Sequence, residues 1–320
     1  MKATVKRQKA KLIVLACTAL FMLSGCRGKT DISQPAVIPM RVVTDDLGRQ
    51  VTLPVKVTRV VSTAPSVTEN IFAVGAGDRL VGVTTFCNYP EQAKEIAKIG
   101  DTMTPNMESI IALKPDVVFV STASQIEAFM KTLSGQGIAV YVTNPYGIED
   151  VFKNLEQFGI IFGTMDKSQK LIRELEDREH AIWRTLGTPL GRDEQPVEYD
   201  KRVGTVRVFV QISKEPLFTV GKDGFLNDLL LSAGGRSVTE SVASAYPKLS
   251  KETALALNPA AIILSDSEDN KEPNEVFKNS PAVKNGRVYK VNADLLSRPG
   301  PRLVDALEQI AKDLHPDKFK

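Results

Sequence analysis

Two segments of this chain, which begin 144 residues apart, are similar enough to be read as copies of one another. The first segment is Asn106–Pro115 and the second is Ser250–Pro259. Each begins with a helix-capping residue, continues as a short apolar helix and ends at a proline, after which a strand-like apolar run follows. One copy in each half predicts two similar lobes with a cleft between them. The competing interpretation is that both segments are ordinary junctions between a helix and a strand.

The repeat also aligns two glutamates, Glu108 in the first copy and Glu252 in the second. Both fall in the first turn of a predicted helix, where a carboxylate stabilises the helix dipole and needs no other function. The alignment therefore puts one acidic side chain at the same place on each lobe, whether or not the pair has a function.

The N-terminus predicts where the protein works. Five basic residues precede the apolar run Leu12–Leu23, which leads through Ser-Gly to Cys26. This pattern is typical of a secretory signal peptide, and the run is too short to cross a membrane. Small residues before a cysteine resemble the lipobox of bacterial lipoproteins, which predicts a signal peptide over 1–25, lipidation of Cys26 and a tether over 26–39. Such a protein is anchored in the periplasm or on the outer face of the cytoplasmic membrane. The competing interpretation is an ordinary signal peptide with an incidental cysteine.

Removing the signal peptide changes the net charge of the chain from +3 to −2, because residues 26–320 hold 36 basic and 38 acidic residues. This balance gives no basic surface for a nucleic acid. Of the three cysteines, Cys17 leaves with the signal and Cys26 is the lipidation site, so no internal disulfide is expected. We interpret the remaining Cys87 as a packed thiol near the cleft.

The sequence argues against a metal centre and against catalysis. His180 and His315 are the only histidines, whereas zinc or manganese receptors use several histidine and carboxylate ligands. There is no nucleophile–base set and no Cys/His cluster, and the glycines Gly75 and Gly77 lack the third member of a dinucleotide-binding loop. We therefore predict a protein that is not an enzyme and that carries no resident metal or cofactor.

Strand and helix patterns alternate along the mature chain, which predicts an α/β fold with mainly parallel sheets covered on both faces. A hairpin is expected first, where 40–44 and 51–53 flank a turn. The helical spacing of apolar residues over Thr164–Leu186 predicts one helix of roughly 34 Å, which would join two lobes and hold them nearly fixed. The predicted divisions are an N-terminal lobe over 40–163, a bridging helix over 164–187 and a C-terminal lobe over 188–320. Strands are expected at 57–62, 80–85, 117–120, 138–142, 205–212 and 287–291, and further helices at 67–74, 125–133, 225–232 and 302–314.

Seven segments, spread over almost the whole mature chain, resemble a known family: the substrate-binding lipoproteins of ABC importers for cobalamin, haem and ferric siderophores. The family's fold has two α/β lobes bridged by one long helix, which agrees with the helix expected at Thr164–Leu186. The resemblance implies a monomeric receptor that works with a permease dimer and its ATPase. The segments are Val60–Glu69, Phe86–Pro90, Asn106–Val120, Phe218–Lys222, Ala233–Gly235, Tyr246–Pro247 and Arg298–Arg302.

Within this family the chain looks most similar to the cobalamin-binding proteins. The resemblance implies a corrinoid ligand held between the lobes by aromatic faces and by polar groups at the amide rim of the macrocycle. Two positions depart from it, because Thr102 and Ser121 stand where the cobalamin binders carry tryptophan. The implied ligand-binding residues are Phe86, Tyr89, Phe218, Tyr246, Asp294 and Arg298.

Other interpretations of these residues stay open. A haem receptor would use Tyr89 or Tyr246 as an iron ligand, and a ferric siderophore receptor would use Arg298 with Arg302 against an anionic chelate. Similar α/β pairs also occur in metal-cluster and chelatase enzymes. Structural roles compete as well: Phe218 as core, Tyr246 as part of a turn, and the two arginines as supports of the last helix.

A capping box is one such structural role, because Ser66-x-x-Glu69 has the spacing in which serine and glutamate cap a helix. The family resemblance gives the aligned glutamates a role too. In the family, a glutamate on the outer surface of each lobe docks against arginines of the permease, and the matching residues here are Glu108 and Glu252.

Overall fold

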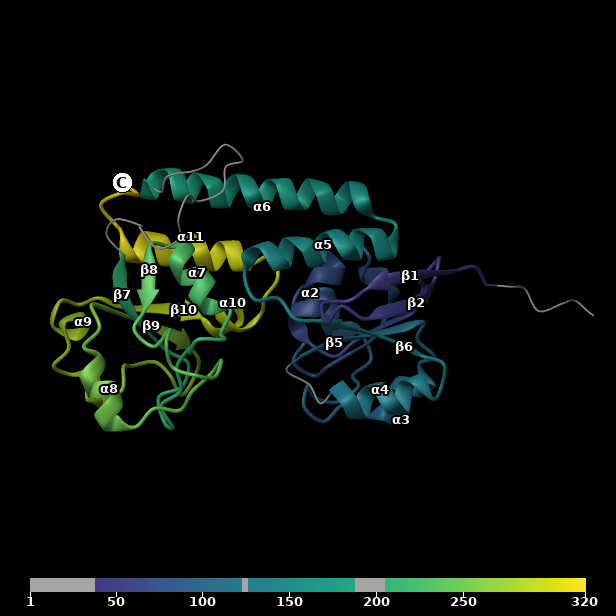
Figure 1. Ribbon diagram of the computed structural model, residues 1–320, viewed down its shortest axis with the longest axis horizontal. Coiled ribbons are helices and arrows are strands. Elements are labelled where there is room, and N and C mark those ends of the chain that lie inside the picture. Colours follow the sequence, from purple (N-terminus) through teal and green to yellow (C-terminus); the bar gives the residue numbers. More distant parts are fainter. Residues whose placement is uncertain (1–37, 123–125, 188–204) are drawn as a thin grey trace, which may run out of the picture. The chain divides into compact units, whose positions relative to one another are not determined.

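The computed structural model describes residues 38–122, 126–187 and 205–320 (Figure 1). The predicted signal peptide, Cys26 and most of the tether lie outside the described residues, as do residues 188–204 at the start of the predicted C-terminal lobe. Residues 39–320 form a single unit by their contacts. Among the described residues, none of the helices combines the length and apolarity needed to span a bilayer.

The described chain opens with the expected hairpin. Strand β1 (Met40–Thr44) pairs antiparallel with β2 (Gln50–Pro54), and Gly48 takes the left-handed backbone conformation that the turn requires (φ +74°). The buried carboxylate of Asp45 accepts hydrogen bonds from the backbone N–H groups of Leu47 and Arg49. The second oxygen of the same carboxylate accepts from the N–H of Val142 (3.2 Å), so the turn is held both by its own backbone and by a later strand.

Two four-stranded parallel sheets follow, and they have the same topology. The first sheet has the order β4-β3-β5-β6 and the second the order β10-β9-β7-β8. Read from its other edge, the second sheet repeats the first, with each strand replaced by the one four places later in the chain. The two similar lobes predicted from the internal repeat are therefore confirmed. The strands are β3 (Val60–Ser62), β4 (Leu80–Val83), β5 (Val117–Ser121), β6 (Ala139–Thr143), β7 (Val206–Gln211), β8 (Gly235–Ser237), β9 (Ala261–Asp266) and β10 (Val288–Asn292).

Helices cover both faces of each sheet, and three apolar clusters fill the layers between. One cluster runs through both lobes and takes in Phe119, Leu175 and Leu307. A second belongs to the N-terminal lobe alone and contains Ile110, and a third belongs to the C-terminal lobe alone and contains Ala254. The helices of the lobes are α2 (Pro65–Ala73), α3 (Met107–Ala112), α4 (Ile126–Ser134), α5 (Ile148–Phe162), α7 (Leu226–Ser232), α8 (Lys251–Leu257), α9 (Pro281–Lys284), α10 (Ala293–Ser297) and α11 (Leu303–Leu314), with the 3₁₀ turns η1 (Gly77–Arg79), η2 (Glu91–Glu95) and η4 (Glu275–Phe277).

Helix α6 (Met165–Leu186) is the bridging helix that the sequence predicts. It runs without a break for 22 residues and ends at Gly187, whose φ of +74° suits the left-handed position after a helix. Helix α6 packs against α5 of the first lobe and α11 of the second (Figure 1). Arg178 also forms ion pairs with Asp305 (2.8 Å) and Glu308 (3.1 Å) of α11. The residue limits proposed for the lobes stay predictions.

The repeat at the two helix–strand junctions is built as predicted. The side chain of Asn106 caps α3 by accepting a hydrogen bond from the N–H of Ser109 (2.9 Å), and Ser250 caps α8 in the same way through Thr253 (3.1 Å).

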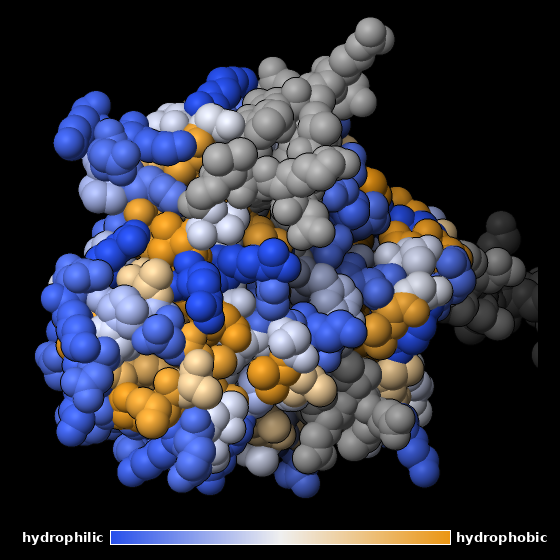
Figure 2. All heavy atoms as spheres, turned by 60° about the vertical axis from the view of Figure 1, so that its left-hand side comes forward, coloured by the Kyte–Doolittle hydropathy of each residue, from blue (hydrophilic) through white to orange (hydrophobic). Residues whose placement is uncertain are grey.

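On the face of the molecule shown in Figure 2, apolar residues come to the surface in small groups separated by hydrophilic ones. The visible part of this face therefore has no broad apolar surface.

Candidate functional site

A cavity of about 330 Å³ collects residues from both lobes at the carboxyl ends of their strands. Phe86 follows β4, Ser121 ends β5 and Asp294 follows β10, while Arg298 comes from the loop after α10. Parallel strands present their carboxyl ends at one edge of a sheet, which is where ligands bind in α/β folds. Three of the predicted ligand residues, Phe86, Asp294 and Arg298, are thus brought together. Thr102 and Ser121, the two departures from the cobalamin binders, line the same cavity.

Arg298 is the centre of a buried polar network at this cavity. The residue is 8% exposed. Its guanidinium donates to Glu69 (2.9 Å) and Asn88 (2.7 Å) and pairs with Asp294 (2.6 Å). The guanidinium of Arg298 therefore donates to groups of the protein itself, while Asn88, which is exposed, and Asp294, whose side chain is 35% exposed, carry the network to solvent.

Glu69 joins the two lobes and does not close a capping box. Its carboxylate is 3% exposed, and besides Arg298 it accepts two hydrogen bonds from Arg302 (2.8 and 2.6 Å). Helix α2 begins instead at Pro65, after Ala64, without any side-chain cap. The expected capping box is therefore wrong. A helix that starts with proline already lacks one free N–H, and two guanidinium groups bind a buried carboxylate far more strongly than a backbone amide does.

Tyr89 lies in a neighbouring cavity of about 350 Å³, which it shares with Phe72 and Arg302. The guanidinium carbon of Arg302 is 4.0 Å from the centroid of the Tyr89 ring, which is a cation–π contact. Partial burial works against the charge of Arg302, but its hydrogen bonds to Glu69 outweigh this and raise the pKa of the guanidinium. Tyr89 is 47% exposed, so one part of its ring stays open to solvent.

Phe218 and Tyr246 lie together on the C-terminal lobe, outside the cavity of Phe86. Phe218 is partly buried and pairs through its backbone with Lys248, and the carbonyl of Pro247 accepts a hydrogen bond from Thr219 (3.1 Å). Protein around the Tyr246 hydroxyl raises its pKa, yet 44% of the residue is accessible. The accessible fraction is the better guide to ligand contact, because it counts the surface that a molecule from solvent can touch.

Cys87 and the two aligned glutamates complete the predicted residues that the structure describes. Cys87 is 1% exposed, and its sulfur lies 3.2 Å from the hydroxyls of both Thr68 and Thr84, which agrees with a packed thiol. Glu108 and Glu252 are both exposed in the first turns of α3 and α8. The pKa of Glu252 is lowered by hydrogen bonds to its own backbone N–H and to Ser250, so this side chain also supports the start of its helix.

Sequence reasoning missed Asn88, and it gave Glu69 only a local role. Neither residue carries a local signal of its position, because their partner Arg298 lies more than 200 residues further along the chain. Among the described residues, no group of three or more His, Cys, Asp and Glu side chains is placed to hold a metal ion.

Residues 60–295 match a protein family described as "Periplasmic binding protein". The chain belongs to this family. It is 32% identical to the uncharacterized ABC transporter substrate-binding lipoprotein YvrC of Bacillus subtilis, over 98% of this chain and 99% of that protein. It is 29% identical to the vitamin B12-binding protein of Vibrio parahaemolyticus, over 82% of this chain and 92% of the relative.

Solved structures of periplasmic binding proteins have the same fold as this chain. The periplasmic vitamin B12 binding protein BtuF of Vibrio cholerae superposes with a TM-score of 0.69 and 25% identity, covering 83% of this chain and all of that one (100%). A periplasmic heme binding protein of Pseudomonas aeruginosa reaches the same TM-score of 0.69 at 22% identity, covering 81% and 93%, and shows the fold alone. The relatives are substrate-binding proteins of ABC transporters and not enzymes, as the sequence predicts. A periplasmic binding protein of this kind works outside the cytoplasm and carries a transported ligand in place of a cofactor.

Proposed function

We propose that this periplasmic binding protein is a lipid-anchored receptor that captures a corrinoid between its two lobes and delivers it to the permease dimer of an ABC importer. The observation that supports this most is the cavity of Phe86 and Asp294, which is lined by an exposed aromatic residue from one lobe and a partly exposed carboxylate from the other. Relatives that cover most of the chain are named for vitamin B12 binding.

Each residue is assigned a role in ligand binding according to the chemical group that it exposes to solvent. Phe86 is 58% exposed, and we assign it, with Tyr246 and Phe218, to the apolar faces of the macrocycle. Asp294 would accept hydrogen bonds from amide groups at its rim. Arg298 lines the same cavity, and its ion pair with Asp294 fixes the direction of that carboxylate.

Delivery requires a second surface, and we assign it to Glu108 and Glu252. Both are exposed, and both sit in the first turn of helices that the same strand order places at equivalent positions in the two lobes. A receptor with such internal symmetry would offer one carboxylate to each subunit of a permease dimer. Arginine–carboxylate pairs set orientation more reliably than they set affinity. Lipidation of Cys26 would keep the receptor near the importer.

Ligand titration tests this function. The protein, purified in detergent, should bind cobalamin or cobinamide at one site with sub-micromolar affinity, about −8 kcal/mol or better. Phe86→Ala and Tyr246→Ala should each weaken binding by about 1–3 kcal/mol, because each removes an apolar face from the ligand. Leu255→Ala is the matched control, since Leu255 is an exposed apolar residue on α8 and 63% accessible.

The same titration separates the alternatives within the family. Haemin and a panel of ferric siderophores are added under the same conditions. Tight binding of either, without detectable binding of a corrinoid, would refute the corrinoid assignment and leave the family membership intact. If haemin binds, Tyr89→Phe and Tyr246→Phe test which tyrosine is the iron ligand, because each removes a hydroxyl that would bind haem iron and keeps the ring.

A further inference from the structure

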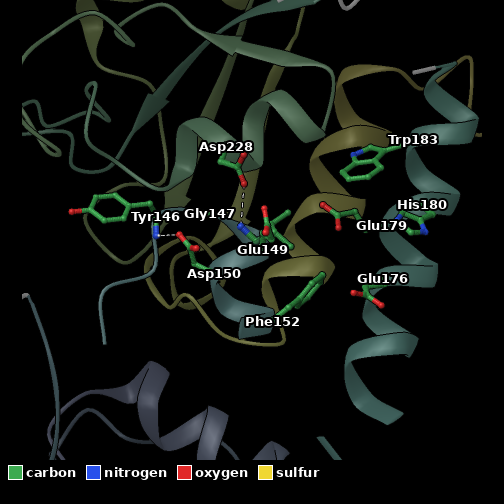
Figure 3. A pocket seen from close by; sticks show the side chains of 11 residues that line it. Tyr146, Gly147, Glu149, Asp150, Phe152, Glu176, Glu179, His180, Trp183 and Asp228 are labelled. Atoms are coloured by element: carbon green, nitrogen blue, oxygen red, sulfur yellow. Dashed lines mark hydrogen bonds between the residues drawn. The ribbon is translucent and has the colours of Figure 1, made fainter. Parts of the chain in front are cut away.

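A third cavity, of about 450 Å³, lies where α5, α6 and α7 meet (Figure 3). Its lining comes from the start of α5 and the two residues before it, from Glu176 to Trp183 on α6, and from Asp228 on α7. It shares no lining residue with the cavity of Phe86 and Asp294. A molecule bound here would touch both lobes and the bridging helix at once.

The lining of this cavity is strongly acidic. Neither lysine nor arginine is among its described lining residues. Lys153 pairs with two of the carboxylates from outside, at 2.9 Å from Glu149 and 3.4 Å from Asp150. Glu176, which is partly buried, makes no hydrogen bond or ion pair with any described residue. Such a surface attracts a cation. The carboxylates are those of Glu149, Asp150, Glu176, Glu179 and Asp228.

Trp183 gives the cavity a second, independent feature. The residue is 3% exposed, and its indole Nε1 is buried without a hydrogen-bond partner in the described part of the chain. In Figure 3 this nitrogen lies on the edge of the ring that faces Glu179 and Asp228. Leaving a buried donor without an acceptor costs free energy of folding. A ligand that brings an acceptor atom to this N–H would therefore gain a hydrogen bond there. The aromatic rings of Trp183 and Phe152 would also favour an ammonium or guanidinium group.

The geometry does not suit a metal ion. No three His, Cys, Asp or Glu side chains of the described residues converge as metal ligands. Two of the carboxylates are also held by backbone groups, because Asp228 accepts from Ile148 N–H (3.0 Å) and Asp150 from Tyr146 N–H (3.0 Å). Carboxylates fixed apart on three helices match a larger cation. We infer that this cavity binds an organic cation, an ammonium or guanidinium compound that also carries a hydrogen-bond acceptor.

The single tryptophan of the chain makes this inference directly testable, because all indole fluorescence comes from Trp183. The detergent-purified protein is titrated with arginine amide and with choline, each of which joins a cationic group to an acceptor oxygen. Saturable changes in fluorescence are expected below about 1 mM for at least one of the two probes. Glu176→Gln should weaken binding at least about tenfold, because it removes a carboxylate without an ion pair of its own. Glu174→Gln, on the same helix but exposed and 3.8 Å from Lys170, should leave binding unchanged.

A second variant addresses the indole donor. Trp183→Phe keeps an aromatic ring and removes the N–H, so calorimetry should show a loss of several-fold in affinity for arginine amide. Melting curves confirm that each variant folds. The inference is overturned if neither probe saturates by about 10 mM, which would mean that only water fills the cavity. It is also overturned if Glu174→Gln and Glu176→Gln weaken binding equally. Corrinoid titrations of the same variants report on the other cavity, so failure here leaves the proposed function untouched.

Discussion

Replacing Glu69 by glutamine should destabilise the protein far more than any exposed charge change. Its carboxylate is 3% exposed and accepts hydrogen bonds from Arg298 and Arg302 of the other lobe. Breaking a buried ion pair by removing one partner costs about 3–5 kcal/mol, because the other charge is left buried and unpaired. Glutamine keeps the shape and one acceptor oxygen, and Arg298 keeps Asp294. We therefore expect Glu69→Gln to lower the free energy of unfolding by about 3 kcal/mol, the lower end of that range.

Urea unfolding measures this loss, followed by far-UV circular dichroism and by Trp183 fluorescence. Glu91→Gln is the matched control, because Glu91 pairs with Lys94 while both side chains are at least half exposed (80% and 50%). Such a surface pair contributes about 1 kcal/mol or less. A loss below about 1 kcal/mol for Glu69→Gln, with an unchanged urea dependence, would refute the view that this carboxylate stabilises the junction of the lobes.

Two further predictions concern transport and motion. Glu108→Arg and Glu252→Arg should leave corrinoid affinity unchanged and impair uptake, and the double variant should be worse than either single one. Normal uptake by the double variant, with a loss of stability of only a few tenths of a kcal/mol, would mean that these residues only stabilise their helices. Small-angle scattering should give nearly the same radius of gyration with and without ligand, because α6 is unbroken and packs against both α5 and α11; a large contraction on binding would show that the helix bends.

The alternation of strands and helices could be predicted because each element carries its own periodic pattern. The caps of α3 and α8 could be predicted for the same reason, since Asn106 and Ser250 act within four residues of sequence. Helix α5 was not predicted, although it is 15 residues long. Its N-cap, Gly147, has no capping side chain, and the first N–H of the helix, on Ile148, is satisfied by Asp228 from the other lobe. A helix capped from 80 residues away shows no capping residue at the start of its own sequence.

In the candidate site, too, some residues could be predicted from the sequence and others could not. The sequence, through its family resemblance, singled out Phe86, Asp294 and Arg298, which the fold brings to one cavity. It assigned Glu69 to a helix cap, because the nearest partner in sequence was Ser66. Arg298 and Arg302 lie 229 and 233 residues away, and only the packing of the two lobes brings them to that carboxylate. Charge pairs between residues so far apart in the chain produce no local sequence pattern from which they could be predicted.

The separation of the apolar clusters has a consequence for which amino-acid substitutions the protein can accept during evolution. The cluster shared by both lobes and α6 couples its members, so a substitution at Leu175 is felt on both sides of the molecule. The clusters beneath α3 and α8 share no residue, and Ile110 and Ala254 each serve one lobe. Substitutions in these two layers should therefore add independently in their effects on stability. Each of these layers can therefore accept substitutions without repacking the interior that both lobes depend on.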